Sequence, residues 1–264
     1  MHPIERLRYV ARSSGAPQQI LVEETAAALT SFGFDPQGLV TACRRMIARQ
    51  PSSAPLVWLA ARLLTSGDPR HEARLVVDEI AADPTGPRLG AALPVDATVC
   101  VLGWPDVAGD ALLARGDLDV LVVDAMGEGS GLVQRLWRAE IDAVDVPLSG
   151  LGAAAADADV VVIEASAIGP DEALVLPGSR AAAAVACHAG VAVWLVGGVG
   201  RLLPQRMWDG LRGRTASDEP WDGDEELIPL GLVSHLVGSE GPELVADGLR
   251  RVACPVVPEL FGTW

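Results

Sequence analysis

The sequence predicts an α/β protein in which an N-terminal helical domain precedes a doubly wound domain built on a parallel sheet. Three observations support this prediction. The length of 264 residues allows one sizeable core and a smaller unit. The first eighty or so residues have helical periodicity, interrupted by short polar turns. From residue 95 onward, short runs rich in Val, Ile and Leu alternate with helical segments, which is typical of strands covered on both faces.

The helical domain is expected to cover residues 1–83. Its predicted helices span 4–10, 18–31, 36–49, 52–64 and 70–82. Two of them begin at an Asp-Pro pair, Asp35-Pro36 and Asp68-Pro69, because aspartate is a good N-cap and proline fits the first helical position. Residues 84–94 follow as a predicted linker, since the stretch 83–94 contains three prolines and two glycines.

The α/β domain is expected to cover residues 95–264. Its six predicted strands are the runs ATVCVLG, DVLVVDA, AVDVPL, ADVVVIEA, VAVWLVGG and SHLVG. Helices are expected between them at 106–114, 130–140, 151–156, 179–189 and 204–211. The segment 214–226 is polar and acidic, and is predicted to be a loop that covers a face or mediates a contact.

The charge balance excludes several classes of partner and site. The formal net charge is −15, so we expect neither nucleic acid nor an anionic membrane as a partner. All 20 basic residues are arginine. A Walker-A phosphate loop and a pyridoxal or Schiff-base site both need lysine, so both are excluded.

Cysteine usage indicates a reducing compartment. The four cysteines lie far apart and form no C-x-x-C pair, which argues against a zinc site and a disulfide framework. We therefore expect free thiols, a cytoplasmic location, no metal and no cofactor. The charged N-terminus lacks the apolar core of a signal peptide. The apolar stretch 181–200 is interpreted as a helix, a glycine cap and a buried strand rather than a membrane span.

Candidate functional residues follow the predicted strands, because ligands of open α/β sheets bind beyond the carboxyl ends of the strands. They are Cys100, Asp124, Glu164, Ser166 and Arg201. Cys100 has two interpretations, a reactive thiol facing a crevice or a buried apolar filler. The stretch GGVG at 197–200 lacks the full G-x-G-x-x-G spacing, so a tight strand-to-helix turn is favoured over a phosphate loop.

Five stretches resemble a known family in the family's own order. They are SGAP at 14–17, QPSSAPLVW at 50–58, ADVVVIEASAI at 158–168, PGS at 177–179 with the following Ala-rich helix and GVAV, and PLGLVS through SEG at 229–241. Together they resemble the α, β and δ subunits of translation initiation factor 2B, a family that includes methylthioribose-1-phosphate isomerase and ribose-1,5-bisphosphate isomerase. The resemblance implies a helical N-terminal domain, a Rossmann-like C-terminal domain and homodimers formed through the latter.

The resemblance also assigns site residues. The family's enzymes use a cysteine and an aspartate for proton transfer on a sugar phosphate, and the matching positions here are Cys100 and Ser166. A serine hydroxyl is a poor general base near neutral pH. The matching ligand-binding positions are Gly15, Ala16, Arg49, Gln50, Gly178 and Ser179, to which Arg201 is added as a possible anion ligand. Several of the family's arginines and its lysine are replaced, which weakens the binding of a phosphate dianion.

The expected function is a binding or regulatory role with a degenerate active site, directed at a protein partner or a non-phosphorylated metabolite. The alternative is an aldose–ketose isomerase acting on a ribose-phosphate-type substrate. Its rebuilt site would pair Cys100 with Glu164 or Asp124 for proton transfer, with Arg180 or Arg201 holding an anion. A third possibility, a subunit that promotes nucleotide exchange, rests on family analogy alone.

Overall fold

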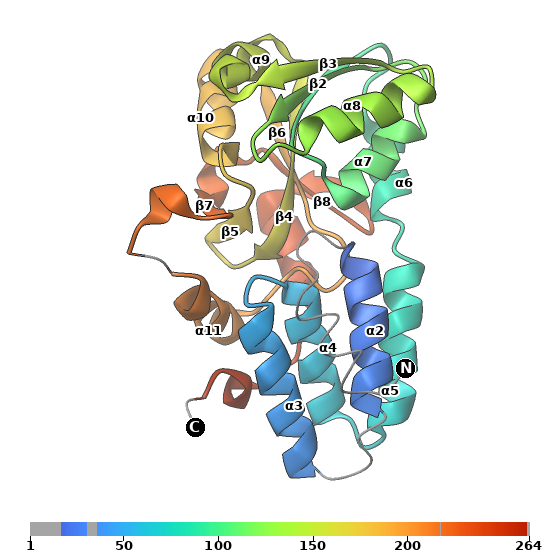
Figure 1. Cartoon of the computed structure of the whole chain (residues 1–264), viewed down its shortest axis with the longest axis vertical. Coiled ribbons are helices and arrows are strands. Elements are labelled where there is room, and N and C mark those ends of the chain that lie inside the picture. The colour runs from blue at the N-terminus through green and yellow to red at the C-terminus, as the bar shows by residue number, and fades with distance from the viewer. Residues whose placement is uncertain (1–16, 31–35, 217, 263–264) are drawn as a thin grey trace.

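A computed structural model describes residues 17–30, 36–216 and 218–262 of the protein. Four helices lie side by side at one end of the molecule, and the sheet with its flanking helices forms the other end (Figure 1). The four helices are α2 (Gln18–Thr30), α3 (Pro36–Arg49), α4 (Ala54–Thr65) and α5 (Pro69–Ala81). The central one is α4, which is apolar around most of its circumference and is therefore buried by its neighbours.

The sheet contains nine strands, of which seven follow the order β3-β2-β1-β4-β6-β8-β9. The strands are β1 (Thr98–Leu102), β2 (Asp119–Asp124), β3 (Asp142–Pro147), β4 (Val160–Ile168), β5 (Glu172–Val175), β6 (Ala192–Val196), β7 (Glu226–Pro229), β8 (His235–Gly238) and β9 (Gly241–Leu244). Neighbours from β3 to β8 pair in parallel, whereas β9 is antiparallel to β8. Strands β5 and β7 extend antiparallel from β4.

Helices cover both faces of this sheet, as the continuous apolar runs predict. They are α6 (Thr85–Ala92), α7 (Asp106–Leu113), α8 (Gly129–Arg138), α9 (Leu151–Asp157), α10 (Ser179–Ala189) and α12 (Val245–Gly248). Helix α11 (Gln205–Thr215) instead packs into the core of the helical end. Successive residues of β1 point to opposite faces of the sheet. Val99 and Val101 pack with residues of α6, α7 and α8, whereas Cys100 packs with residues of α9 and α10. The predicted fold class, helical region followed by a mostly parallel α/β sheet, is confirmed.

The helical end shares a core with one side of the sheet. Trp58 of α4 is 2% exposed and lies in a cluster with Leu174 of β5, Met207 and Trp208 of α11, and Leu260 near the C-terminus. Side-chain hydrogen bonds of Asp83 also connect the helical end to the sheet. The Asp83 carboxylate accepts hydrogen bonds from the Thr85 backbone N–H (2.9 Å) and from the Val199 backbone N–H (2.7 Å).

Several sequence predictions about local structure need correction. The expected linker contains helix α6, because Pro87 falls in the first helical turn, where proline is tolerated, and Asp83 accepts from the Thr85 N–H. Strand β3 is largely exposed because it is the edge of the sheet. The short antiparallel strands β5, β7 and β9 were not predicted. The Asp68 cap is confirmed, since its side chain accepts from two backbone N–H groups of α5.

Two further predictions, the helix at 4–10 and the Asp35 cap, lie outside the described residues. Within the described ranges, no helix combines the length and the apolar character that crossing a bilayer requires.

Candidate functional site

The strand order reverses direction between β1 and β4, and a cavity of about 190 Å³ lies beside the carboxyl ends of these strands. Such a switch point is where open α/β sheets bind ligands. Five regions line the cavity: the start of α2, the start of α4, the α5–α6 connection, the start of α7 and the loop after β6. We call it the switch-point cavity. Of the residues that the sequence singles out, Arg201 is the one that lines it in the described part of the chain.

A buried ion pair forms the charged centre beside this cavity. Arg201 Nη1 donates to Glu164 Oε1 and to the Ala165 carbonyl, and both distances are 2.7 Å. The exposed fractions of the two charged side chains are only 4% for Arg201 and 9% for Glu164. The second carboxylate oxygen of Glu164 accepts from the backbone N–H of Ala108 in the first turn of α7 (2.9 Å). Glu164 thus neutralises Arg201 and satisfies a donor at the helix N-terminus.

The remaining charged groups of the cavity are acidic. Asp83, Asp106 and Asp110 line it. Burial raises the pKa of Asp106 above its ordinary value, and the nearby negative charge of Glu164 raises it further. The Gln18 backbone N–H donates to Asp106 (3.2 Å) and opposes part of this shift. The cavity therefore disfavours additional negative charge.

Asp106→Asn is expected to raise the midpoint of thermal unfolding by about 1–3 °C at pH 7 and to change it little at pH 4. A carboxyl group whose folded pKa is raised stabilises the fold when protonated, and this contribution is lost as pH rises through the raised pKa. Asparagine keeps an acceptor for Gln18 without the charge. The check is calorimetry at both pH values, with Asp142→Asn as control because Asp142 is exposed on β3 and does not line the cavity. An unchanged or lower midpoint for Asp106→Asn at pH 7 would contradict the expectation.

Cys100 does not reach the switch-point cavity. It lies in the middle of β1 and is fully buried, and burial raises the pKa of its thiol to about 12. The residues that follow the carboxyl end of β1 are Gly103 and Trp104. Of the two interpretations, the geometry favours the buried apolar filler, because a neutral and inaccessible thiol is poorly suited to proton transfer.

Asp124 serves the turn after β2. Its Oδ1 accepts from the Gly127 N–H (2.7 Å) and from the Gly129 N–H (3.1 Å) at the start of α8. Gly127 has a φ of 83°, a conformation that favours glycine. The Asp124 carboxylate therefore stabilises this turn through both hydrogen bonds.

Ser166 lies where the register of β4 against β5 shifts between Ala165 and Ala167. Such an irregularity redirects a side chain. Ser166 and Ser52 lie near the carboxyl group of Glu225, which immediately precedes β7. Burial is the main reason that the pKa of Glu225 is raised. Sequence reasoning missed this glutamate, although it lies in the acidic segment that the composition singled out.

The positions that the family resemblance assigns to ligand binding are dispersed. Gly15 and Ala16 lie outside the described residues. Arg49 is exposed at the end of α3, and Gln50 follows it. Gly178, with a φ of 91°, precedes α10, and Ser179 is buried at its start. None of these described residues lines the switch-point cavity.

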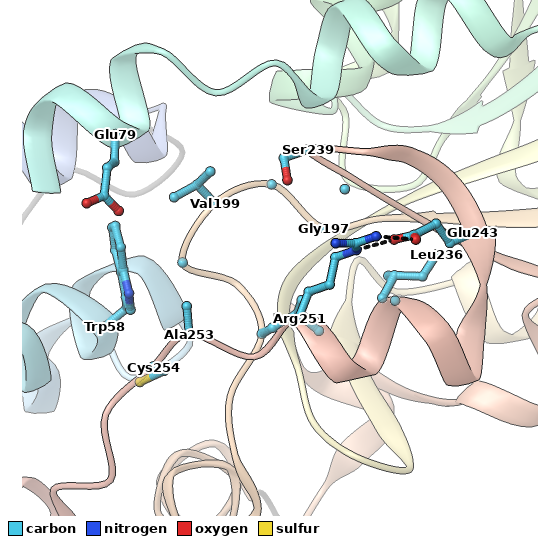
Figure 2. Close-up of a pocket in the computed structure, with 15 residues that line it drawn as sticks. Trp58, Glu79, Gly197, Val199, Leu236, Ser239, Glu243, Arg251, Ala253 and Cys254 are labelled. Atoms are coloured by element: carbon cyan, nitrogen blue, oxygen red, sulfur yellow. Dashed lines mark hydrogen bonds and ion pairs between the residues drawn. The ribbon is translucent and has the colours of Figure 1, made fainter.

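A second cavity, of about 200 Å³, lies on the other side of the loop after β6. Figure 2 shows Trp58 and Glu79 on one wall and the ion pair of Arg251 with Glu243 (2.6 Å) on the other. The glycines of this loop are explained by close packing. A Cβ on Gly198 would lie 2.5 Å from the Asp83 carboxylate, and one on Gly200 would lie 2.8 Å from the Trp58 ring. These contacts favour the tight-turn interpretation over a phosphate loop.

The described residues bring no three His, Cys, Asp or Glu side chains together in a way that could hold a metal ion. The site therefore consists of a buried ion pair and the surrounding carboxylates.

Neither a protein-family model nor a curated protein sequence matches the chain. Solved structures do. The translation initiation factor eIF-2B of Pyrococcus horikoshii OT3 aligns with a TM-score of 0.77 at 12% identity, over 94% of this chain and 98% of the other. The eIF2B beta subunit of Chaetomium thermophilum aligns with a TM-score of 0.72 at 16% identity, over 99% and 93%.

A chain of the tetrameric eIF2B beta2-delta2 complex from C. thermophilum aligns with a TM-score of 0.75 at 17% identity, over 94% of this chain and 91% of that one. Identities this low establish architecture and leave activity open. The chain has the fold of the eIF2B α, β and δ subunits, which confirms at the level of the fold the resemblance carried by its sequence motifs.

Proposed function

We propose that the protein is an eIF2B-like binding or regulatory protein with a degenerate active site, whose switch-point cavity takes a ligand without a phosphate dianion. The observation that carries this proposal is the buried pair of Glu164 and Arg201. A phosphate dianion is held by charge-assisted donors, each contributing about 1.5–3 kcal/mol. Here the charge of Arg201 is already neutralised, and Asp83, Asp106 and Asp110 repel a further anion. A neutral or cationic metabolite, or a protein side chain, suits this environment.

The assembly and location are part of the same proposal. One structurally similar protein forms a tetrameric beta2-delta2 complex. By analogy, we propose that this chain forms a homodimer through its sheet domain, residues 95–264, in the cytoplasm. The net charge of −15 supports a metabolite or protein partner over nucleic acid or an anionic membrane.

The isomerase alternative has less support from the geometry. It needs Cys100 to exchange protons with Glu164 or Asp124. Cys100 is fully buried, Glu164 is paired with Arg201, and Asp124 accepts two backbone hydrogen bonds.

Sugar phosphates are expected to leave the thermal unfolding midpoint unchanged. A ligand present at 100 times its Kd stabilises a protein by about 2.7 kcal/mol, which raises the midpoint of a chain of this size by several degrees. The measurement is a thermal shift series with ribose 5-phosphate, methylthioribose 1-phosphate and ribose 1,5-bisphosphate, with ribose and inorganic phosphate as controls. A saturable rise with a sugar phosphate that ribose and inorganic phosphate do not produce would contradict the proposal.

A further inference from the structure

The second cavity is bounded by elements from both ends of the molecule. Its walls come from α4, α5, the loop after β6, the β8–β9 hairpin, α12 and the segment 251–254. Its volume is about 200 Å³. An engineered apolar cavity of about 150 Å³ binds benzene, so this cavity has room for a branched or aromatic group with a small polar head. Its ligand is therefore smaller than the drug-sized molecules that large clefts hold.

One wall of this cavity contains a buried hydrogen-bond donor that the protein does not use. Trp58 lines the cavity and is 2% exposed, and its indole Nε1 has no hydrogen-bond partner in the part of the chain that the structure describes. Figure 2 shows this nitrogen at the end of the ring directed toward Ala253 and Cys254, which line the same cavity. A buried donor without an acceptor is unfavourable, so a ligand with an acceptor oxygen is favoured here.

The loop after β6 adds backbone donors to this cavity. Gly198 and Gly200 line it, and the backbone N–H groups of both lack an acceptor within the described ranges. The N–H of Val199 between them is already used, because it donates to Asp83 (2.7 Å). Gly200 also lies against Trp58, so its N–H belongs to the same wall as the indole. Successive backbone N–H groups in a loop without side chains suit a carboxylate oxygen.

The charged groups of the cavity leave one negative charge uncompensated on this wall. Glu79 lies beside the indole in Figure 2, and its carboxylate pairs with Arg62 (3.0 Å). Arg62 also pairs with Glu72, so two carboxylates share one guanidinium and one negative charge remains. On the opposite wall, Arg251 and Glu243 neutralise each other through two hydrogen bonds of 2.6 and 2.7 Å. A ligand ammonium at Glu79 completes the charge balance.

We propose that the second cavity binds an α-amino acid with an apolar side chain. The ligand's carboxylate accepts from the Trp58 indole and from the backbone of the loop after β6, and its ammonium donates to Glu79. An α-amino acid carries both groups on one carbon, so it needs donors and an acceptor side by side, as this wall supplies them. Its side chain extends along Leu202 and Leu236, which also line the cavity. This site is additional to the switch-point cavity.

The test is titration calorimetry of the full chain with L-leucine and L-phenylalanine at pH 7. Each amino acid is compared with an analogue that lacks the ammonium, isocaproate or hydrocinnamate, and with one that lacks the carboxylate, isoamylamine or phenethylamine. We expect saturable binding of at least one of the two amino acids. Its two analogues are expected to bind about 10-fold more weakly or worse, because each loses a charge-assisted hydrogen bond.

Three variants locate the binding. Trp58→Phe removes the indole donor and Glu79→Gln removes the charge, and each is expected to weaken amino-acid binding by about 10-fold. Ala253→Phe adds a ring at an exposed position of the cavity wall and is expected to abolish binding. The matched controls are Asp78→Asn, beside Glu79 but outside the cavity, and Asp110→Asn in the switch-point cavity. Both are expected to bind like the unchanged protein.

Two results would overturn the proposal. One is the absence of saturable binding of both amino acids up to about 10 mM, which is weaker than most metabolite sites. The other is binding that Trp58→Phe, Glu79→Gln and Ala253→Phe all leave unchanged. Neither result would bear on the proposed function, because that proposal concerns phosphate at the switch-point cavity and is tested with sugar phosphates.

Discussion

Arg201→Ala is expected to lower the free energy of unfolding by about 3–5 kcal/mol, because removing one partner of a buried ion pair leaves the other charge uncompensated. The stranded group is Glu164, whose side chain is 9% exposed and cannot turn to water without leaving the Ala108 N–H. Arg201 also donates to the Ala165 carbonyl, so the variant loses a second hydrogen bond. Urea unfolding followed by circular dichroism at pH 7 measures the effect.

The control for this prediction removes both charges together. The double variant Glu164→Gln with Arg201→Met keeps side chains of similar length and leaves no buried charge. Replacing a whole buried pair is often close to neutral, so most of the lost stability is expected to return. A loss below about 1 kcal/mol for Arg201→Ala, the range of an exposed pair, would show that the pair is solvated. A double variant as unstable as the single one would show that the charge is not the cause.

Trp58→Ala is expected to lower the free energy of unfolding by about 3–5 kcal/mol, the range observed for large aromatic side chains removed from cores. Trp58 is 2% exposed and belongs to the core that joins the helical end to the sheet. Its ring lies under the Arg62 guanidinium, 5.1 Å from the ring centroid, and against Gly200, where even a Cβ would come within 2.8 Å. The same urea experiment measures the loss.

The variant Trp58→Phe separates the contribution of apolar packing to stability from the effect of the buried indole N–H. The indole Nε1 of Trp58 is buried and has no hydrogen-bond partner among the described residues, so phenylalanine keeps much of the apolar contact and removes this donor. Phenylalanine leaves a smaller cavity than alanine does, so we expect a cost of about 1–2 kcal/mol. A cost of Trp58→Ala below about 1 kcal/mol would show that the shared core does not depend on this ring.

Much of the architecture could be predicted from the sequence because the signals are local. The apolar run of β1 predicts a strand that is buried on both faces. The structure places Val99 and Cys100 on opposite sides of the sheet. Helix α6 stands where the prolines predict a linker, because Pro87 lies in the first helical turn, where proline is tolerated. Strands such as β7, with the sequence ELIP, are too short to show a period. The domain limits at 84–94 stay a prediction.

The site was harder to predict, because its contacts join residues distant in the sequence. Glu164 and Arg201 were both candidates, but their pairing depends on the parallel alignment of β4 with β6 and on the turn that follows β6. Glu225 lies near Ser52, which is distant from it in the sequence, and no local pattern predicts this. Cys100 was placed near a strand end from its position in an apolar run, whereas β1 continues through Leu102. The proposed catalytic and ligand-binding roles of the resemblance-based residues stay predictions.

The central claim is that Glu164 occupies Arg201 and so excludes phosphate, and titration calorimetry of Glu164→Gln beside the unchanged protein tests it most directly. With inorganic phosphate and ribose 5-phosphate, the unchanged protein is expected to give no binding heat at millimolar ligand. Glu164→Gln, in which Arg201 keeps its charge without a counterion, is expected to bind both, since a buried guanidinium is then free to pair with an anion. Tight phosphate binding by the unchanged protein, undiminished by the presence of Glu164, would contradict the account.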